Sequence, residues 1–524
     1  MNNSDMPDLT DKVGQLFMIG VRSEILSDEE KEFINSYNIG FIILFSRNIS
    51  SAEQLKKLTS SIHRAGETPP MIFIDQEGGP IVRLGEMGST LISHMGLAAT
   101  GKIKNARKAG QIIGEELNIL GIDGVFAPVL DVNTTGDNPV IGIRAFSDDP
   151  LIVAKFGSAF FKGLKKSRIV ACGKHFPGHG HTFKDSHLEI PESNIDMKFL
   201  SEVNLPPFQK LINAGIDSIM TAHVLFPAIS KEIATFSPCI TKDILRNDLG
   251  FSGVLFSDCL EMDAVKKNYS SEQIIEKVID TSLDVVSVSH SIVLQKELVE
   301  LFRKKINDNK KYRDRVDESL QRIEKLKKKI KTVKDANVPV LRRNRKKEKK
   351  IAIESITLLK NDLNIVPIRK KGTLLVLDMK KNIHTANLSG EKIRSETEKI
   401  FGDLFRRIKY IQIKKDSESL NEHTDKIVGS DYVLLLNHSI NGNMNVKELS
   451  LTEHILELRK DLILVFAGSP YPVKKFKNAG TIILTYGSRN VQLEALISIL
   501  SGEAKPKGIL PVSISRQFPF GSYA

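Results

Sequence analysis

The chain has no tryptophan and only three cysteines among its 524 residues. Cys172, Cys239 and Cys259 lie far apart and form no CxxC pair, which argues against a disulfide framework and against the zinc or redox sites built on such pairs. No apolar run approaches the roughly 20 residues that span a bilayer, and residues 1–10 have neither the basic residues nor the apolar segment of a secretion signal. We therefore expect a cytoplasmic globular protein without a membrane partner.

The net charge of +12 comes from one part of the chain. Residues 303–350 hold 21 of the 75 lysines and arginines but 7 of the 63 acidic residues, so the remainder is close to neutral. Apolar residues recur there as on one face of a helix: Val316, Leu320, Ile323, Leu326 and Ile330. We interpret the segment as a solvated helix followed by a basic linker over 331–350; the alternative is a patch for an anionic partner. No aromatic residues are interleaved with the charge, so we expect no nucleic-acid partner.

Eight short apolar runs occur in the first 290 residues, separated by turn residues or by stretches long enough for a helix. They cover 16–21, 41–45, 71–74, 125–129, 169–172, 218–221, 254–256 and 284–288. Alternating strands and helices are typical of a parallel sheet, and eight such units predict a closed (β/α)8 barrel of the TIM type. This alternation stops in the basic segment.

A second series of apolar runs begins beyond it, as expected for a chain too long for one ordinary core. These runs cover 373–377, 432–436, 462–466 and 481–485. We therefore predict an α/β protein with three parts: a catalytic barrel over 1–330, the basic linker over 331–350, and a smaller C-terminal α/β sandwich domain over 351–524.

Reactive side chains follow the ends of the first series of runs. They are Asp75 and Glu77 after the third run, Asp131 after the fourth, Lys174 and His175 after the fifth, His223 after the sixth and Asp258 after the seventh. In a barrel the carboxyl ends of all strands open on one face, where active sites are built. An open, doubly wound sheet would not easily bring so many strands to one pocket. The pattern therefore favours the barrel and places the site at this face.

Residues 174–187 contain four of the twelve histidines, with a proline and two glycines between 177 and 180. Histidine titrates nearest to neutral pH, while proline and glycine give a loop a fixed shape, so the segment is predicted to be a reaction centre. Three of its histidines have the residue type of metal ligands: His175, His179 and His181. The intervening proline and glycines break any regular ligand spacing, which argues against a metal.

Asp185 and His187 lie two residues apart at the end of this loop. A carboxylate beside an imidazole fixes its tautomer and stabilises its cation, so the imidazole can protonate a leaving oxygen and later accept a proton from water. We interpret the pair as a general acid/base dyad. The candidate nucleophile is Asp258, which ends an apolar strand on the same predicted face; the alternative is that it caps the next turn. In that case the neighbouring carboxylates Glu261 and Asp263 take its place.

Several segments carry recognisable motifs. They are residues 74–83 (IDQEGGPIVR), 141–146 (IGIRAF), 174–187 (KHFPGHGHTFKDSH), 257–258 (SD), 354–361 (ESITLLKN) and 508–512 (GILPV). In their order and spacing they resemble the β-N-acetylglucosaminidases of glycoside hydrolase family 3, in the NagZ-like branch with two domains, over the whole chain. The KHFPGHG loop followed by Asp-Ser-His is highly specific, and Asp-Gln-Glu-Gly-Gly is moderately so.

The resemblance implies a β-N-acetylhexosaminidase with a retaining mechanism and a covalent glycosyl-enzyme intermediate. By position, Asp258 is the nucleophile, His187 the acid/base and Asp185 its partner. The positions that match the family's sugar-binding residues are Asp75, Arg83, Arg144, Lys174 and His175. No metal and no other cofactor is implied. The substrates of the family are N-acetylglucosaminyl-muramyl fragments of peptidoglycan or short chitooligosaccharides, which fits recycling of wall fragments in the cytoplasm.

The lack of tryptophan agrees with that expectation, because a pocket that grips one terminal sugar by polar contacts needs no aromatic platforms. The expected action is therefore exo. The chain departs from the family's pattern at Pro80, His181 and Cys259, where relatives often carry an arginine, a small or acidic residue and an aspartate. These departures leave every proposed catalytic group in place.

Three alternatives remain at the level of sequence. A β-glucosidase of the same superfamily would take its acid/base from a glutamate of the C-terminal domain, and the Asp-Ser-His triplet argues against it. A phosphorylase would use the same dyad and pass the sugar to phosphate, which the sequence does not separate from hydrolysis. A non-enzymatic sensor would have lost one of the three catalytic residues, and all three are present.

Overall fold

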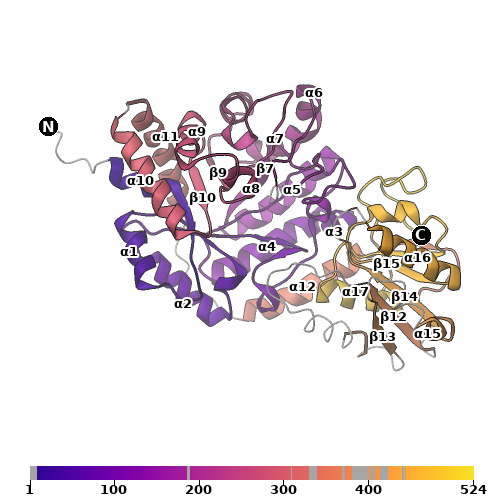
Figure 1. Cartoon of the computed structure of the whole chain (residues 1–524). Coiled ribbons are helices and arrows are strands. Elements are labelled where there is room, and N and C mark those ends of the chain that lie inside the picture. Colours follow the sequence, from indigo (N-terminus) through magenta and orange to yellow (C-terminus); the bar gives the residue numbers. More distant parts are fainter. Residues whose placement is uncertain are drawn as a thin grey trace.

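The computed structural model describes residues 9–185, 189–308, 310–329, 339–368, 372–379, 400–402, 408–413, 423–439, 442 and 444–524. This part of the chain forms a barrel, coloured indigo to red in Figure 1, and a smaller orange to yellow sheet domain beside it. Across these ranges, no helix combines the length and the apolar character needed to cross a lipid bilayer.

Eight parallel strands close into the barrel in the order β1-β10-β9-β8-β7-β6-β3-β2. They are β1 (Phe17–Gly20), β2 (Phe41–Leu44), β3 (Met71–Ile74), β6 (Gly124–Val125), β7 (Val170–Phe176), β8 (Ser218–Thr221), β9 (Val254–Cys259) and β10 (Val285–Val288). Each overlaps one of the eight predicted runs, so the predicted barrel is confirmed. Strand β6 is shorter than expected because Pro128, which has no N–H to donate, follows it closely. Strand β7 is longer and extends into the histidine loop.

Helices follow the strands and cover the outside of the barrel (Figure 1). They are α1 (Asp28–Ser36), α2 (Ala52–His63), α3 (His94–Ala99), α4 (Ile103–Ile119), α5 (Pro150–Lys166), α6 (Met197–Phe199), α7 (Leu205–Asn213), the wider helix η7 (Cys239–Asp248), α8 (Asp263–Lys266), α9 (Ser271–Asp280), α10 (Ile292–Asp308) and α11 (Lys310–Lys327). Several begin where a serine side chain accepts a hydrogen bond from the first helical turn. At α1, for example, Ser27 accepts from the N–H of Glu30, and the Glu30 carboxylate accepts from the N–H of Ser27.

Aromatic side chains fill the interior of the barrel. Phe256 of β9 lies 5.3 Å from Phe41, 5.2 Å from Phe73 and 5.7 Å from Phe126, measured between ring centroids. All four rings are completely buried. The inward-pointing residues of a closed barrel form such a packed layer rather than a pore, so the reacting groups are confined to the rim above it.

The second domain is built on a six-stranded sheet in the order β11-β16-β15-β14-β12-β13, in which only β11 runs antiparallel to its neighbour. Its strands are β11 (Thr357–Asn361), β12 (Leu374–Met379), β13 (Ile408–Gln412), β14 (Tyr432–Asn437), β15 (Ile463–Phe466) and β16 (Thr481–Leu484). Its helices include α15 (Thr424–Val428), α16 (Val446–Leu458) and α17 (Asn490–Leu500). The predicted α/β domain is thus confirmed, with β11 and β13 added to the four predicted strands.

The basic segment joins the two domains and is helical where the structure describes it. Helix α11 lies on the barrel, and α12 (Pro339–Ser355) packs against α3, α4 and α17, beneath the junction in Figure 1. Residues 331–338 lie outside the described residues, while the rest of the segment that we expected as a linker belongs to α12. Its buried side chains include two polar ones, Asn344 and Glu348, and Glu348 accepts hydrogen bonds from Thr90 and from the N–H of Leu91 in the barrel.

The aromatic layer generates a stability prediction. Phe256→Ala should lower the free energy of unfolding by about 3–5 kcal/mol, because it leaves a cavity between three buried rings. Urea titration followed by circular dichroism measures the change. Leu151→Ala on α5, where the side chain is 61% exposed, is the control and should change it by less than about 0.5 kcal/mol. Equal effects of the two substitutions would contradict the packed interior.

Candidate active site

A cavity of about 320 Å³ opens at the carboxyl ends of the barrel strands. It is lined by six of the eight residues to which the sequence assigned a catalytic or sugar-binding role: Asp75, Arg83, Arg144, Lys174, His175 and Asp258. They come from the ends of β3, β7 and β9, from the hairpin after β3 and from the loop after β6. Within the part of the chain that the structure describes, the lining residues of this cavity all come from the barrel, between Ile43 and His290.

Buried ion pairs connect the charged residues of the cavity. Lys174 lies 3% exposed, with Nζ 2.8 Å from Oδ1 of Asp75 and 2.7 Å from Oε1 of Glu77. Arg144 forms a two-pronged pair with Glu77, in which Nε donates to Oε2 and Nη2 to Oε1, both at 2.9 Å. On the other side, Arg83 Nη2 donates to Oδ2 of Asp75 at 3.3 Å. Each of these buried or partly exposed charges is therefore paired with a charge of opposite sign.

Glu77 is central to this network, although sequence analysis assigned it no role. Burial works to raise the pKa of its carboxyl group, but the positive charges of Arg144 and Lys174 outweigh that effect and hold the pKa well below its usual value. Asp75 is also shifted downward, against burial, by Lys174 and Arg83. Both carboxylates are thus ionised at neutral pH. In the sequence, Glu77 stood out only by its position shortly after a predicted strand. That it neutralises Arg144 and Lys174 follows only from the distances between their side chains.

Asp131 organises the histidine loop from the end of β6. Its Oδ2 accepts from Nδ1 of His175 at 2.7 Å, and its Oδ1 accepts from the N–H of His179 at 2.7 Å. These contacts leave Nε2 of His175 near Arg144 Nη2, at 3.4 Å, on the cavity side. Asp131 is a second residue that sequence analysis noted at a strand end without assigning a role.

Two further histidines of the loop, His179 and His181, are hydrogen-bonded within the protein. His179 Nδ1 lies 2.9 Å from Oγ1 of Thr182, and His181 Nδ1 lies 2.8 Å from Oγ1 of Thr134. Burial, together with the charge of His175, lowers the pKa of His179 to about 4, so its ring is neutral at physiological pH. Within the described ranges these histidines form no cluster with the close ligand spacing of a metal site.

Asp258 lies near the end of β9 and lines the cavity. Its Oδ1 accepts a hydrogen bond from the N–H of Cys259 at 2.7 Å. Burial acts to raise the pKa of the carboxyl group, but the nearby His223 and His175, that N–H and Lys174 together lower it below its usual value. The group is therefore an ionised carboxylate with its open side toward the cavity, as a nucleophile requires.

The structure describes only one of the two residues of the predicted dyad, Asp185. His187 lies outside the described residues. Asp185 is partly exposed, its backbone O accepts from the N–H of Glu189 at 3.1 Å, and it is not among the residues that line the cavity. Their predicted acid/base roles therefore remain predictions.

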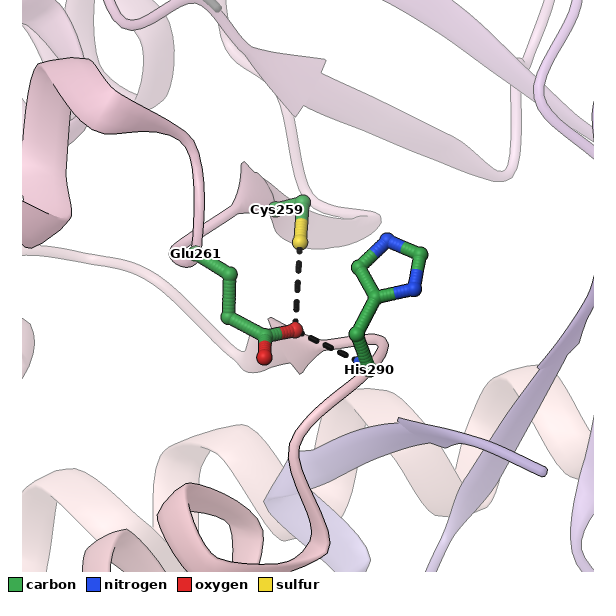
Figure 2. Close-up of side chains that lie close together, drawn as sticks. All are labelled: Cys259, Glu261 and His290. Atoms are coloured by element: carbon green, nitrogen blue, oxygen red, sulfur yellow. Dashed lines mark hydrogen bonds between the residues drawn. The ribbon is translucent and has the colours of Figure 1, made fainter. Parts of the chain in front are cut away.

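Cys259, Glu261 and His290 form the one group in the described chain whose His, Cys and carboxylate atoms lie within metal-ligand distance of one another (Figure 2). The Glu261 carboxylate already accepts from three backbone N–H groups, those of Ser289, His290 and Ser291, at 2.6–2.7 Å. A neutral imidazole has one lone pair, and Arg47 Nη1 donates to Nδ1 of His290 at 3.1 Å.

The Cys259 thiol completes this hydrogen-bonded group. Burial raises its pKa to about 11, and its Sγ donates a weak hydrogen bond to Oε2 of Glu261 at 3.8 Å. The group is thus a hydrogen-bonded anchor for the loop after β10 and does not have the free lone pairs that a metal ion needs.

His94 of α3 supports the loop that carries Arg144. Its pKa predicts how the stability of the fold changes with pH. Its Nδ1 donates to the O of Arg144 at 2.8 Å, and its ring stacks on Phe146. Burial lowers its pKa to about 4. Between pH 6.5 and 4 the unfolded chain therefore binds a proton that the folded chain does not, so this group reduces stability as the pH falls through that window, by roughly 3 kcal/mol in all.

His94→Asn keeps a donor near Arg144 and removes the titration. The free energy of unfolding of this variant, measured in urea between pH 7 and 4.5, should fall less steeply with decreasing pH than that of the native chain. His454→Asn, at an exposed position of α16, is the control and should keep the native slope. An unchanged slope in His94→Asn would contradict the buried neutral imidazole.

Comparisons with known proteins agree with this geometry. The model of the glycosyl hydrolase family 3 N-terminal domain matches residues 8–326, and that of the C-terminal domain matches residues 356–519. Beta-hexosaminidase A of Pseudoalteromonas piscicida is 28% identical over an alignment of 552 positions, which covers 94% of this chain and 92% of that protein. A beta-hexosaminidase of Neisseria meningitidis serogroup C (strain 053442) is 37% identical over 303 residues, which cover 56% of this chain and 82% of that protein.

Solved structures show the same relationship. The family 3 beta-N-acetylglucosaminidase of Paenibacillus sp. str. FPU-7 aligns with a TM-score of 0.88 at 28% identity, over 97% of this chain and 99% of that one. NagZ of Neisseria gonorrhoeae, in complex with N-trifluoroacetyl-D-glucosamine, aligns with a TM-score of 0.55 at 32% identity, over 65% of this chain and 98% of that one. Since the two family models follow each other along the chain in the order of its two domains, the chain belongs to glycosyl hydrolase family 3 and is a glycoside hydrolase.

Proposed function

We propose that the protein is a retaining exo-β-N-acetylglucosaminidase that removes a terminal N-acetylglucosamine through a covalent intermediate on Asp258. The observation that carries the proposal is the partly exposed, ionised Asp258 carboxylate, which lines the same cavity as the ion-paired groups of Asp75, Arg83 and Lys174. The names of the relatives from Pseudoalteromonas and Paenibacillus support the choice of the acetamido sugar.

In the first step, a carboxylate oxygen of Asp258 forms a bond to the anomeric carbon of the sugar. The glycosidic C–O bond breaks with its electron pair on the leaving oxygen, which takes a proton from His187. In the second step, water attacks the anomeric carbon and gives its proton to His187, and Asp258 leaves as a carboxylate. Asp185 stabilises the imidazolium form of His187 before the first step and after the second, and it holds the tautomer of the neutral ring between them.

The cavity supports recognition of a single sugar. Its volume of about 320 Å³ lies at the small end of ligand pockets, and its polar groups are held by ion pairs before any substrate arrives. Asp75 accepts from sugar hydroxyl groups, Arg83, Arg144 and Lys174 provide donors to hydroxyl or acetamido oxygens, and His175 presents Nε2 to the sugar. Charged groups make the stronger hydrogen bonds in such a setting.

The group attached to the terminal sugar in the substrate is proposed from the family resemblance of the sequence. We propose N-acetylglucosaminyl-muramyl fragments or short chitooligosaccharides as substrates, with the cytoplasm as the place of action. The free thiols of all three cysteines are consistent with a reducing compartment. The domain boundaries that we propose are those of the sequence, with the catalytic barrel over 1–330, the basic linker over 331–350 and the C-terminal domain over 351–524.

The test compares p-nitrophenyl β-N-acetylglucosaminide with the β-glucoside. The native chain should prefer the acetamido sugar, and Asp258→Ala should lower kcat/KM on the order of 10³-fold or more. Asp263→Ala is a matched control, since this carboxylate also lines the cavity but pairs with Lys267 at 2.7 Å; it should stay within about three-fold of native. Loss of activity in the control but not in Asp258→Ala would move the nucleophile to the neighbouring carboxylate.

A second experiment examines the proposed acid/base. p-Nitrophenolate leaves without much help, so His187→Ala should complete the first step and stall before the second. Intact mass spectrometry of this variant should therefore show the protein plus one N-acetylglucosaminyl residue, which peptide mapping places on Asp258.

Adding phosphate to the native enzyme distinguishes water from phosphate as the acceptor of the sugar. A sugar phosphate product would identify a phosphorylase. Glucoside hydrolysis that survives His187→Ala would place the acid/base in the C-terminal domain.

A further inference from the structure

The chain after β3 folds back on itself as a hairpin of β4 (Gln76–Gly78) and β5 (Ile81–Val82). Asp75 precedes this hairpin and Arg83 follows it, so two of the groups that line the cavity are attached to its ends. The Gln76 side chain accepts from the N–H of Arg83 at 2.8 Å and so connects the two ends. A two-stranded hairpin is marginally stable by itself, so the direction of these groups depends on what holds its turn.

The turn is held from the other domain. Arg489, the residue before α17, donates from Nε to the O of Gly79 at 2.5 Å and from Nη2 to the O of Pro80 at 3.2 Å. A guanidinium group offers its donors in a rigid fork, which suits two neighbouring carbonyl groups.

The same turn lies directly against the start of α3. Gly79 has a φ of +57°, and a Cβ at this position would lie 2.6 Å from the Cβ of Ser93. The Ser93 hydroxyl group in turn donates to the O of Tyr486 at 2.7 Å, in the segment between β16 and α17. The hairpin turn is therefore enclosed between the barrel and the C-terminal domain.

A second loop of the site meets the C-terminal domain in a similar way. Asn133 lies two residues after Asp131, and its Nδ2 donates to Oη of Tyr471 at 3.1 Å, while that hydroxyl group donates to the O of Asn133 at 3.3 Å. None of the described residues that line the cavity belongs to the C-terminal domain, and this domain contacts two loops that carry lining residues.

We propose that Arg489 is a positioning residue of the active site: by holding the carbonyl groups of Gly79 and Pro80 it fixes the hairpin that carries Asp75 and Arg83, and so makes the grip on the terminal sugar depend on the C-terminal domain. The inference rests on the proposed function for its kinetic readout. It adds a role for the C-terminal domain, whose position in the sequence gave no indication of one.

The experiment uses the full chain with Arg489→Ala, Arg489→Lys and the control Arg459→Ala. Arg459 is a matched control because it also donates to backbone carbonyl groups, those of Ile427 at 2.8 Å and Ser430 at 2.6 Å, but within the C-terminal domain. Arg489→Ala should raise KM for the acetamido substrate about ten-fold with a smaller change in kcat, since misplaced binding groups cost transition-state and ground-state contacts alike. Arg489→Lys, with a single ammonium nitrogen in place of the planar fork, should lie between native and Ala, and Arg459→Ala should stay within about two-fold of native.

Hydrogen exchange supplies a readout that does not depend on activity. The amides of residues 76–83 should exchange faster in Arg489→Ala than in the native chain, and at the native rate in Arg459→Ala. A native KM and native exchange in Arg489→Ala would overturn the inference while leaving the proposed function intact. If Arg489→Ala fails to fold, Arg489→Lys decides in the same way. A native chain inactive on the acetamido substrate would refute the proposed function, and exchange at 76–83 would still decide about Arg489.

Discussion

The active site depends on one constraint, the burial of the Glu77 carboxylate, which is 2% exposed at the mouth of the barrel. A buried charge costs several kcal/mol unless it is paired and hydrogen-bonded. Arg144 and Lys174 meet that requirement, and they reach Glu77 from the loop after β6 and from β7. The hairpin, that loop and the strand must therefore all be in place together, and the same ion pairs that satisfy Glu77 fix two proposed sugar-binding cations.

Around this network the histidines differ from the acids in charge state. Burial keeps His94 and His179 neutral, while Asp75, Asp131 and Asp258 stay ionised because cations or N–H groups face them. Neutral rings can lie among the ion pairs without adding unpaired charge. The site thus holds fixed negative and positive groups side by side, which suits a reaction in which charge develops on the sugar ring and on the leaving oxygen.

Much of this arrangement was predictable from the sequence, because parallel strands buried on both faces appear as short apolar runs and the residues after them converge on one face. Asp75, Lys174, His175 and Asp258 were found in this way. The pairing roles of Glu77 and Asp131 were not, since an acid that neutralises a cation cannot be told from one that binds substrate without distances.

The contacts between the two domains could not be predicted from the sequence either. Helix α12 buries polar residues such as Glu348, whose partners lie about 260 positions earlier in the chain, and its abundant basic residues conceal the buried face. Arg489 reaches the hairpin turn from 410 positions away. Such contacts leave no local periodicity, because neither partner has to be apolar.

The aromatic layer beneath the site has a further consequence. Lys174 Nζ lies 6.0 Å from the ring centroid of Phe126, one of the four buried phenyl rings, so the ion-pair network borders the apolar interior of the barrel at this point. A low-dielectric floor directs the electric field of charges above it toward the open side. The apolar interior of the barrel therefore strengthens the electric field that the ion-paired groups produce at the sugar. The same groups on a solvated surface would produce a weaker field.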